Sequence, residues 1–210
     1  MMLSLHAAFS ITSGAALGGA KIARHVQNAK IIDQATKATT EPNVQPIGYD
    51  QYVGTVYAGG AFLWPYAKLE LRVFGLRNYD REAEEMKNTW QGGGELSLLF
   101  RISPELALGL VGGAFVESFK DHFRLKDDKD APLTVDAREH KLWPPRYFGG
   151  IRAAYFITPR WALEVTGTYS FSWPYQEIKG KTGDNRDFSM EYKYVTKKLM
   201  IGFAYHFLVK

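Results

Sequence analysis

The feature that most constrains this chain is an alternation of apolar and polar residues with a period of two. Leu163 and Val165, for example, lie on one face of an extended segment, and Glu164 lies on the other. This alternation over ten or more residues is the pattern of a β-strand with two different faces. Segments of this kind cover residues 3–20, 51–63, 66–79, 90–102, 105–119, 146–157, 160–173 and 192–208.

The connections between these segments alternate between very short and long. The short ones are Trp64-Pro65, Ser103-Pro104 and Thr158-Pro159, and the long ones run near 21–50, 80–89, 120–145 and 174–191. An even number of strands, with tight turns at one end and long polar loops at the other, is typical of membrane barrels. The sequence therefore predicts an all-β fold, a closed eight-stranded antiparallel up-and-down transmembrane β-barrel. We expect residues 1–210 to form a single domain.

Composition narrows the possible classes of protein. No apolar run is long enough for a membrane-spanning helix, whereas aromatic residues reach 14 % and there are 20 glycines. The absence of cysteine excludes disulfides and thiolate metal sites, and a net charge of +4 without a basic cluster argues against nucleic acid as a partner. We predict no metal and no cofactor. His6 and His206 have the same inward parity on two different strands. We favour packing or hydrogen bonding over metal binding for both.

The polar face of the strands carries small residues and a few charges of both signs. A solvated outer surface is normally more charged, whereas an eight-stranded barrel has an interior that only side chains can fill. Because buried charges must be paired, we expect one connected network that closes the lumen, with Arg152 and Glu117 on adjacent strands and both on the inward parity. A proton or ion path is the alternative. The network residues are Lys68, Glu70, Arg72, Glu95, Arg101, Glu117, Arg152, Glu164 and Lys198.

Aromatic residues gather near the ends of the apolar face. Such residues form girdles where a membrane barrel meets the polar head groups of the bilayer. The predicted lipid-facing girdle consists of Trp90, Tyr155, Trp161, Phe171, Trp173, Tyr205 and Phe207.

Two phrases, Ser103-Pro104-Glu105-Leu106-Ala107-Leu108 and Thr158-Pro159-Arg160-Trp161-Ala162-Leu163-Glu164, place a turn proline before an alternating strand. With this architecture, the chain resembles the small eight-stranded outer-membrane proteins of Gram-negative bacteria, the OmpA barrel and OmpX-like group. Its last strand is similar to their C-terminal assembly signal, although three residues follow Phe207. The resemblance implies a multi-pass barrel in the bacterial outer membrane with both termini periplasmic.

For function, the resemblance implies a structural or surface-interaction role, with long extracellular loops and a plugged polar lumen. A narrow pore or small-solute channel and a lipid A-modifying enzyme are the alternatives. Expected partners are outer-membrane lipids and lipopolysaccharide, and an extracellular or envelope protein bound through the loops. Three basic residues lie on the lipid-facing parity near the loops: Arg77, Lys193 and Lys197. We expect them either to contact lipopolysaccharide phosphates or to extend to the membrane interface without a specific partner.

No catalytic residue is assigned. The His-x-Ser pair of deacylases with this shape is absent, and an acyltransferase would draw on Ser118, Asp121, His122 and His140. The first 20 residues lack an early basic residue, so we interpret 3–20 as the first strand and not as a signal peptide. Residues 20–39 have the composition of a short helix, which Pro42 and Pro46 would end.

Overall fold

The computed structural model describes residues 8–33, 35–41, 47–80, 89–117, 122–126, 132–136, 145–172, 176–181 and 186–208. Its regular structure is β throughout these ranges. The strands are β1 (Ala8–Ile32), β2 (Thr39–Thr40), β3 (Ile47–Leu63), β4 (Ala67–Asp80), β5 (Thr89–Arg101), β6 (Leu106–Glu117), β7 (His122–Lys126), β8 (Pro132–Asp136), β9 (Arg146–Phe156), β10 (Trp161–Ser172), β11 (Gln176–Lys181) and β12 (Asp187–Leu208).

Eight of these strands form a closed antiparallel barrel. They follow one another in the order β1, β3, β4, β5, β6, β9, β10, β12, and β12 pairs with β1 to close the sheet. The closing register runs from Ser10 opposite Leu208 to Ile32 opposite Asp187. The predicted closed eight-stranded up-and-down barrel is confirmed. In the described part of the chain, no helix has the length and apolar character needed to cross a membrane.

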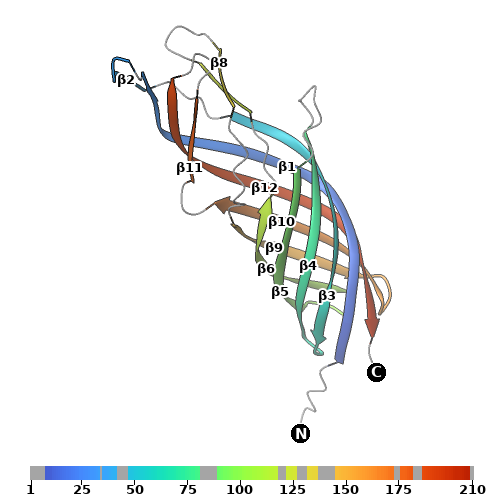
Figure 1. The fold of residues 1–210 in the computed structure, drawn as a ribbon. Helices are drawn as coiled ribbons and strands as arrows, with labels where there is room; N and C mark the ends of the chain where they lie inside the picture. The colour runs from blue at the N-terminus through green and yellow to red at the C-terminus, as the bar shows by residue number, and fades with distance from the viewer. Residues whose placement is uncertain are drawn as a thin grey trace.

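The short turns and both chain ends lie at the same end of the barrel (Figure 1). Each turn closes with a backbone hydrogen bond: the amide of Trp64 donates to Ala67, that of Ile102 to Leu106, and that of Ile157 to Trp161. The proline of each turn occupies a position where no ladder donor is needed. The predicted alternation of tight turns and long connections therefore has a direct structural basis.

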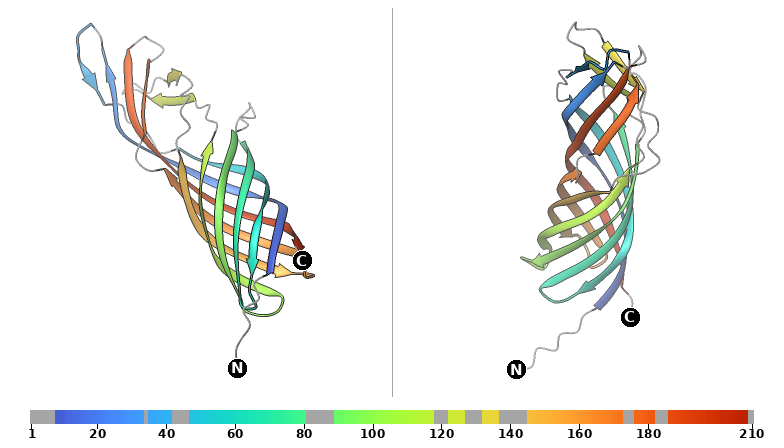
Figure 2. Two further views of the ribbon diagram at one scale, coloured as in Figure 1. Left: turned by 60° about the horizontal axis from the view of Figure 1, so that its bottom comes forward. Right: turned by 60° about the vertical axis from the view of Figure 1, so that its left-hand side comes forward.

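At the opposite end, β1 and β12 continue well beyond the shorter strands (Figures 1 and 2). β1 has 25 residues and β12 has 22, whereas β6 and β10 have 12 each. The short strand β2 extends this ribbon from β1, and β11 extends it from β12. Further strands therefore lie inside three of the segments predicted as loops. They are β2 in 21–50, β7 and β8 in 120–145, and β11 in 174–191.

The predicted first strand is confirmed over its described residues, 8–20, but it continues further than expected, and the predicted helix is wrong. β1 runs on to Ile32, because pairing with β12 between Ser10 and Ile32 outweighs local helix propensity. Asn28 adopts a left-handed conformation, φ 53°, at a break in the register with β12, which is a β-bulge. His6 lies outside the described residues.

A tight turn ends β1 where the helix was expected to continue. The side chain of Asp33 accepts hydrogen bonds from the amides of Ala35 and Thr36, at 2.8 and 3.1 Å. These backbone N–H groups favour the charged carboxylate and hold the pKa of Asp33 below its usual value. Lys37, with φ 55°, then returns the chain toward β2.

The two faces of the sheet differ as the alternation predicted. Outward residues on the wall are large, apolar and exposed, including Leu17, Leu71, Leu110, Ile151 and Ile201. Most buried inward residues are small, polar or charged, and larger apolar side chains such as Leu99 and Phe115 lie among them. β3, whose alternation is the least regular, obeys the same rule, with Val53 and Tyr57 inward and Val56 outward.

A charge introduced on the outer wall tests this assignment of faces. Ile201 is 54 % exposed and lies near the middle of the barrel part of β12. We expect Ile201→Arg to cost about 2–4 kcal/mol of unfolding free energy in lipid vesicles, because hydrocarbon would surround the new charge. Tyr66→Arg, in a turn at the barrel end, should cost far less. Equal costs at the two positions, measured by urea unfolding, would contradict the predicted membrane depth.

Candidate functional site

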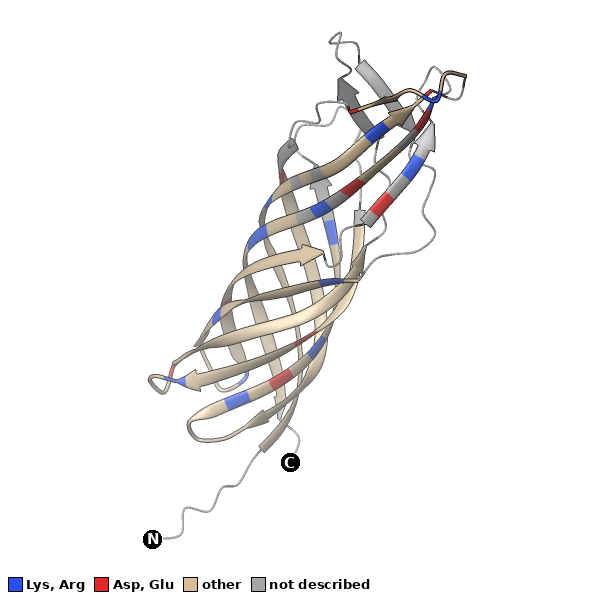
Figure 3. Cartoon of the chain, turned by 90° about the vertical axis from the view of Figure 1, so that its left-hand side faces the viewer, with Lys and Arg blue, Asp and Glu red and all other residues tan. Residues whose placement is uncertain are grey.

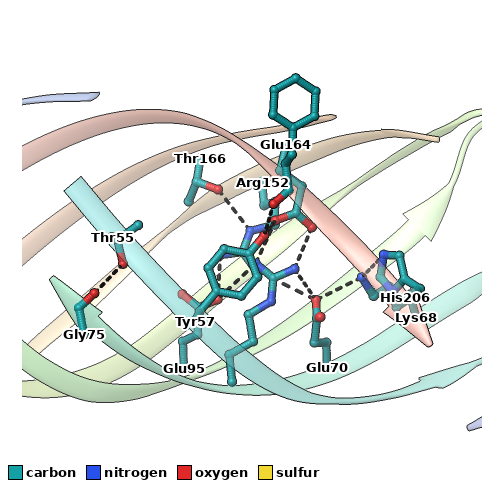
Figure 4. Close-up of polar contacts among 12 residues, drawn as sticks. Thr55, Tyr57, Lys68, Glu70, Gly75, Glu95, Arg152, Glu164, Thr166 and His206 are labelled. Carbon is teal, nitrogen blue, oxygen red and sulfur yellow. Dashed lines mark hydrogen bonds and ion pairs between the residues drawn. The ribbon is translucent and has the colours of Figure 1, made fainter. Parts of the chain in front are cut away.

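A cluster of buried charges crosses the barrel interior at its middle (Figure 4). Arg72 on β4 donates two hydrogen bonds to Glu164 on β10, from Nη1 to Oε2 at 2.7 Å and from Nη2 to Oε1 at 2.6 Å. In the strand order, β4 and β10 lie four places apart in a ring of eight, on opposite walls. This bidentate pair therefore spans the full width of the lumen.

Arg72 also holds the other carboxylates together. Its Nη2 lies 2.7 Å from Glu70 Oε2, and its Nη1 lies 3.6 Å from Glu95 Oε1. Arg72 and Glu70 are almost completely buried. A guanidinium suits this position because its five N–H donors lie in one plane and can serve several carboxylates at once.

The second arginine of the cluster, Arg152 on β9, pairs with Glu95 on β5. Its Nη2 lies 2.6 Å from Glu95 Oε1, and its Nε donates to the hydroxyl of Thr166 at 3.0 Å. Arg152 and Glu117 were predicted to lie on adjacent strands, and β9 and β6 are indeed neighbours. Arg152 pairs in register with Gly109 on β6, eight residues before Glu117, so the two residues lie far apart along the barrel.

Tyr57 on β3 is a member of the cluster that the sequence analysis did not include. Its hydroxyl donates to Glu164 Oε2 at 2.9 Å, and its ring packs under Arg72, with the guanidinium carbon 4.0 Å from the ring centroid. Gly14 on β1 makes this possible, since a Cβ there would collide with the tyrosine ring and hydroxyl. The inward parity of 51–63 was the available signal, and the apolar character of its neighbours hid it.

A smaller polar group lies on the turn side of the cluster. Lys68 Nζ lies 3.0 Å from Glu70 Oε2 and 3.5 Å from Nε2 of His206 on β12. The His206 ring packs against Phe156 with centroids 5.8 Å apart. Below it, Leu99, Ala107 and Ala154 form a buried apolar layer. No group of three or more metal-ligating side chains occurs within the described ranges.

On the other side of the cluster, aromatic side chains fill the lumen. Phe148 lies between Phe74 and Phe115, with ring centroids at 6.0 and 6.1 Å. Above them, Lys198 Nζ lies 2.6 Å from Gln91 Oε1 and 4.9 Å from the Phe115 ring centroid. A cavity of about 40 Å³ runs from the charges past these phenylalanines to Ser170 and Lys198. That volume has room for only a few water molecules.

The structure brings most, but not all, of the predicted network residues into the lumen. Lys68, Glu70, Arg72, Glu95, Arg152, Glu164 and Lys198 are buried there. Arg101 has the correct parity but is exposed at the turn end, over the Phe156 ring at 5.4 Å, so its place in the network is wrong. The side chain of Glu117 lies outside the described residues.

The predicted girdle residues lie on the outer wall wherever they are described. Trp161, Tyr205 and Phe207 pack edge to face in one row near the turns, with centroids at 4.7 and 4.4 Å, and Tyr155 is exposed beside them. Trp90 and Phe171 lie toward the far ends of their strands. Trp173 lies outside the described residues.

The three predicted lipopolysaccharide contacts occupy different parts of the wall. Arg77 on β4 packs over Trp90 at 5.0 Å. Lys193 and Lys197 lie on β12, where Lys193 is partly buried and Lys197 is exposed. Of the residues considered for an acyltransferase, Ser118, Asp121 and His140 lie outside the described residues, and His122 begins β7.

Comparison with known proteins identifies the fold of this chain, but it shows no closer relationship to any one protein or family. No protein-family model matches the chain, and no curated protein matches its sequence. The crystal structure of Neisserial surface protein A matches with a TM-score of 0.50 and 12 % identity, covering 94 % of this chain and 96 % of that one. The outer-membrane protease OmpT of Escherichia coli matches with 0.48 and 12 %, covering 94 % and 97 %. The chain thus has the fold of small outer-membrane β-barrels, as the resemblance implied.

Removing one arginine tests whether the lumen charges depend on each other. We expect Arg152→Met to cost about 3–5 kcal/mol of unfolding free energy, because Glu95 would lose its closest cation while buried. The double change Arg152→Met with Glu95→Gln should cost less, since the uncompensated charge is removed as well.

The matched control is Arg101→Met, at the exposed end of the lumen, which should change stability little. Chemical unfolding in detergent micelles measures all of these variants. A double variant as unstable as the single one would show that Arg152 acts through packing and not through its charge.

Proposed function

We propose that this protein is a structural, surface-presenting barrel of the bacterial outer membrane, built as one domain, with a lumen that does not conduct. The observation that carries the proposal is the bridging of the lumen by side chains from facing walls. Arg72 and Glu164 join β4 to β10, and Lys198 and Gln91 join β12 to β5, in each case across four places of the ring.

The layers between these bridges support a closed lumen. Three phenylalanines lie between the central charges and Lys198, and Leu99, Ala107, Ala154 and Phe156 lie below the charges. Apolar side chains beside a charge cluster limit its contact with water, and they strengthen the ion pairs by lowering the local dielectric. A pore or small-solute channel would require several of these layers to separate.

The outer wall supports insertion in a membrane. Large apolar side chains cover it, and aromatic residues form a row near the turn end. We place the turns and both termini in the periplasm, and the extended ribbon of β1 and β12 outside the cell. Arg77, Lys193 and Lys197 then lie toward the outer leaflet, where lipopolysaccharide phosphates are available to them.

The extended ribbon supports a role in presentation. A tilted strand needs about 9–11 residues to cross the bilayer, so the 25 residues of β1 reach well beyond it. The projecting part is ordered by pairing from Ala23–Val195 to Ile32–Asp187, and Glu191 accepts hydrogen bonds from Gln27 and Asn28. A paired ribbon of this length offers a preorganised surface to an extracellular or envelope protein.

Planar-bilayer recording tests the closed lumen. We expect no steady current through the parent protein, because the Arg72–Glu164 pair and the phenylalanine layer block the path. The variant Arg72→Ala with Glu164→Ala removes the central bridge and should produce a measurable leak. Arg77→Ala, a matched loss of one arginine on the outer wall, should remain silent. Steady ion current through the parent barrel would overturn the proposal in favour of the pore.

A further inference from the structure

A groove lies on the outer wall where β12, β1 and β3 meet. Its volume is about 430 Å³, and its lining includes Gly19, Lys21, Tyr52, Lys197 and Leu199. Gly19 lies at its floor, because it faces outward between two strands and carries no side chain. A Cβ at Gly19 would meet only the carbonyl oxygen of Gln51, at 3.9 Å. The groove therefore exists because glycine occupies this position on the wall.

Two lysines meet directly at one side of the groove. Lys21 on β1 and Lys197 on β12 are cross-strand partners, and both are exposed on the outward face. Directly opposed positions hold their Cβ atoms about 5 Å apart, at which like charges repel. Neither ammonium forms an ion pair with another residue of the described part of the chain. This arrangement leaves two adjacent cations that a shared anion would neutralise.

The wall changes character on the two sides of this lysine pair. Toward the turns, Leu17 is 75 % exposed, and Leu199 and Ile201 are exposed on the neighbouring strand. Tyr52 and Tyr169 flank the lysines, on β3 and β10. Exposed tyrosines beside lysines mark the depth at which a membrane wall meets head groups. In Figure 3, Lys and Arg lie along the long strands toward the end opposite the termini.

We propose that this groove binds the phosphate group of an anionic outer-leaflet lipid, with the phosphate between Lys21 and Lys197 and an acyl chain along Leu17, Leu199 and Ile201. The lipid class is a phosphorylated glycolipid such as lipid A, because the groove combines two cations with an apolar wall. The proposed site thus includes Lys21 and the floor of the groove at Gly19, in addition to Lys197, which the sequence analysis already considered. The proposal depends on the proposed function only in placing this end of the barrel in the outer leaflet.

One acidic residue borders the same groove. Asp50 on β3 is the cross-strand partner of Lys21 on its other side, and it is exposed. It lowers the positive potential at the lysines without forming an ion pair to them in the described residues. Its removal should therefore strengthen the binding of a phosphate. This gives the proposal a variant that is expected to gain affinity.

Native mass spectrometry of the full protein in detergent measures binding of bisphosphorylated lipid A. We expect Lys21→Gln with Lys197→Gln to weaken binding on the order of 25-fold, which is about fivefold for each lysine. Asp50→Asn should tighten it. Lipid A stripped of both phosphates should bind the parent as weakly as bisphosphorylated lipid A binds the double variant.

Two glycine variants distinguish binding of the lipid in the groove from a general attraction of the lipid to cations. Gly19→Leu fills the groove and leaves both lysines in place, and it should reduce lipid A binding as strongly as loss of the lysines. Gly149→Leu is the matched control, since Gly149 also faces outward and a Cβ there would meet no atom within 4 Å. It should bind lipid A like the parent.

Three outcomes would overturn the proposal. They are unchanged lipid A binding by the double lysine variant, equal effects of Gly19→Leu and Gly149→Leu, and full competition by inorganic phosphate at the concentration of the lipid. Heat-dependent migration in gel electrophoresis confirms that each variant is folded. Because binding in detergent is independent of ion conduction, a conducting barrel would refute the closed lumen and leave this site intact.

Discussion

The pairing of β1 with β12 is the interaction on which the rest of the structure depends. A strand edge in hydrocarbon would leave a row of N–H and C=O groups without partners, so a sheet in a membrane must close on itself. Here the first and last strands of the barrel complete the ladder, from Ser10–Leu208 upward. Closure after eight strands sets a narrow interior, and a narrow interior determines which side chains it can hold.

Closure also inverts the usual distribution of polarity. The wall exposes leucine, isoleucine and aromatic residues, and the core contains arginine, glutamate and lysine. Charges in such a core are costly to desolvate and are tolerated only when they are paired and hydrogen-bonded. Arg72 forms ion pairs with Glu70, Glu95 and Glu164 and hydrogen bonds with Glu164, to which Tyr57 donates a further hydrogen bond. The same pairing joins facing walls of the barrel, since Arg72 and Glu164 lie four places apart in the ring.

Strand length divides the molecule into two regions with different surroundings. β1 and β12 first form part of the barrel wall and then continue as a ribbon that the shorter strands do not accompany (Figure 2). Their outward residues change accordingly, from Leu17 and Ile201 on the wall to Lys21 and Lys197 at its upper limit. One pair of strands thus carries an apolar outward surface, a boundary with opposed cations and a ribbon that extends beyond the shorter strands.

The sequence by itself determined the strands, their connection pattern and the two faces, because these depend on local alternation and on turn prolines. It also indicated most of the lumen charges, since parity alone assigns a residue to a face. It did not determine which charges meet: Arg152 pairs with Glu95 on a strand that is not its neighbour, and Arg101 lies outside the network at the barrel end. Those contacts depend on strand register and on which walls face each other across the closed ring, and only the tertiary structure decides both. The length of β1 was decided in the same way, because its pairing with β12 overrode the helical composition of residues 20–32.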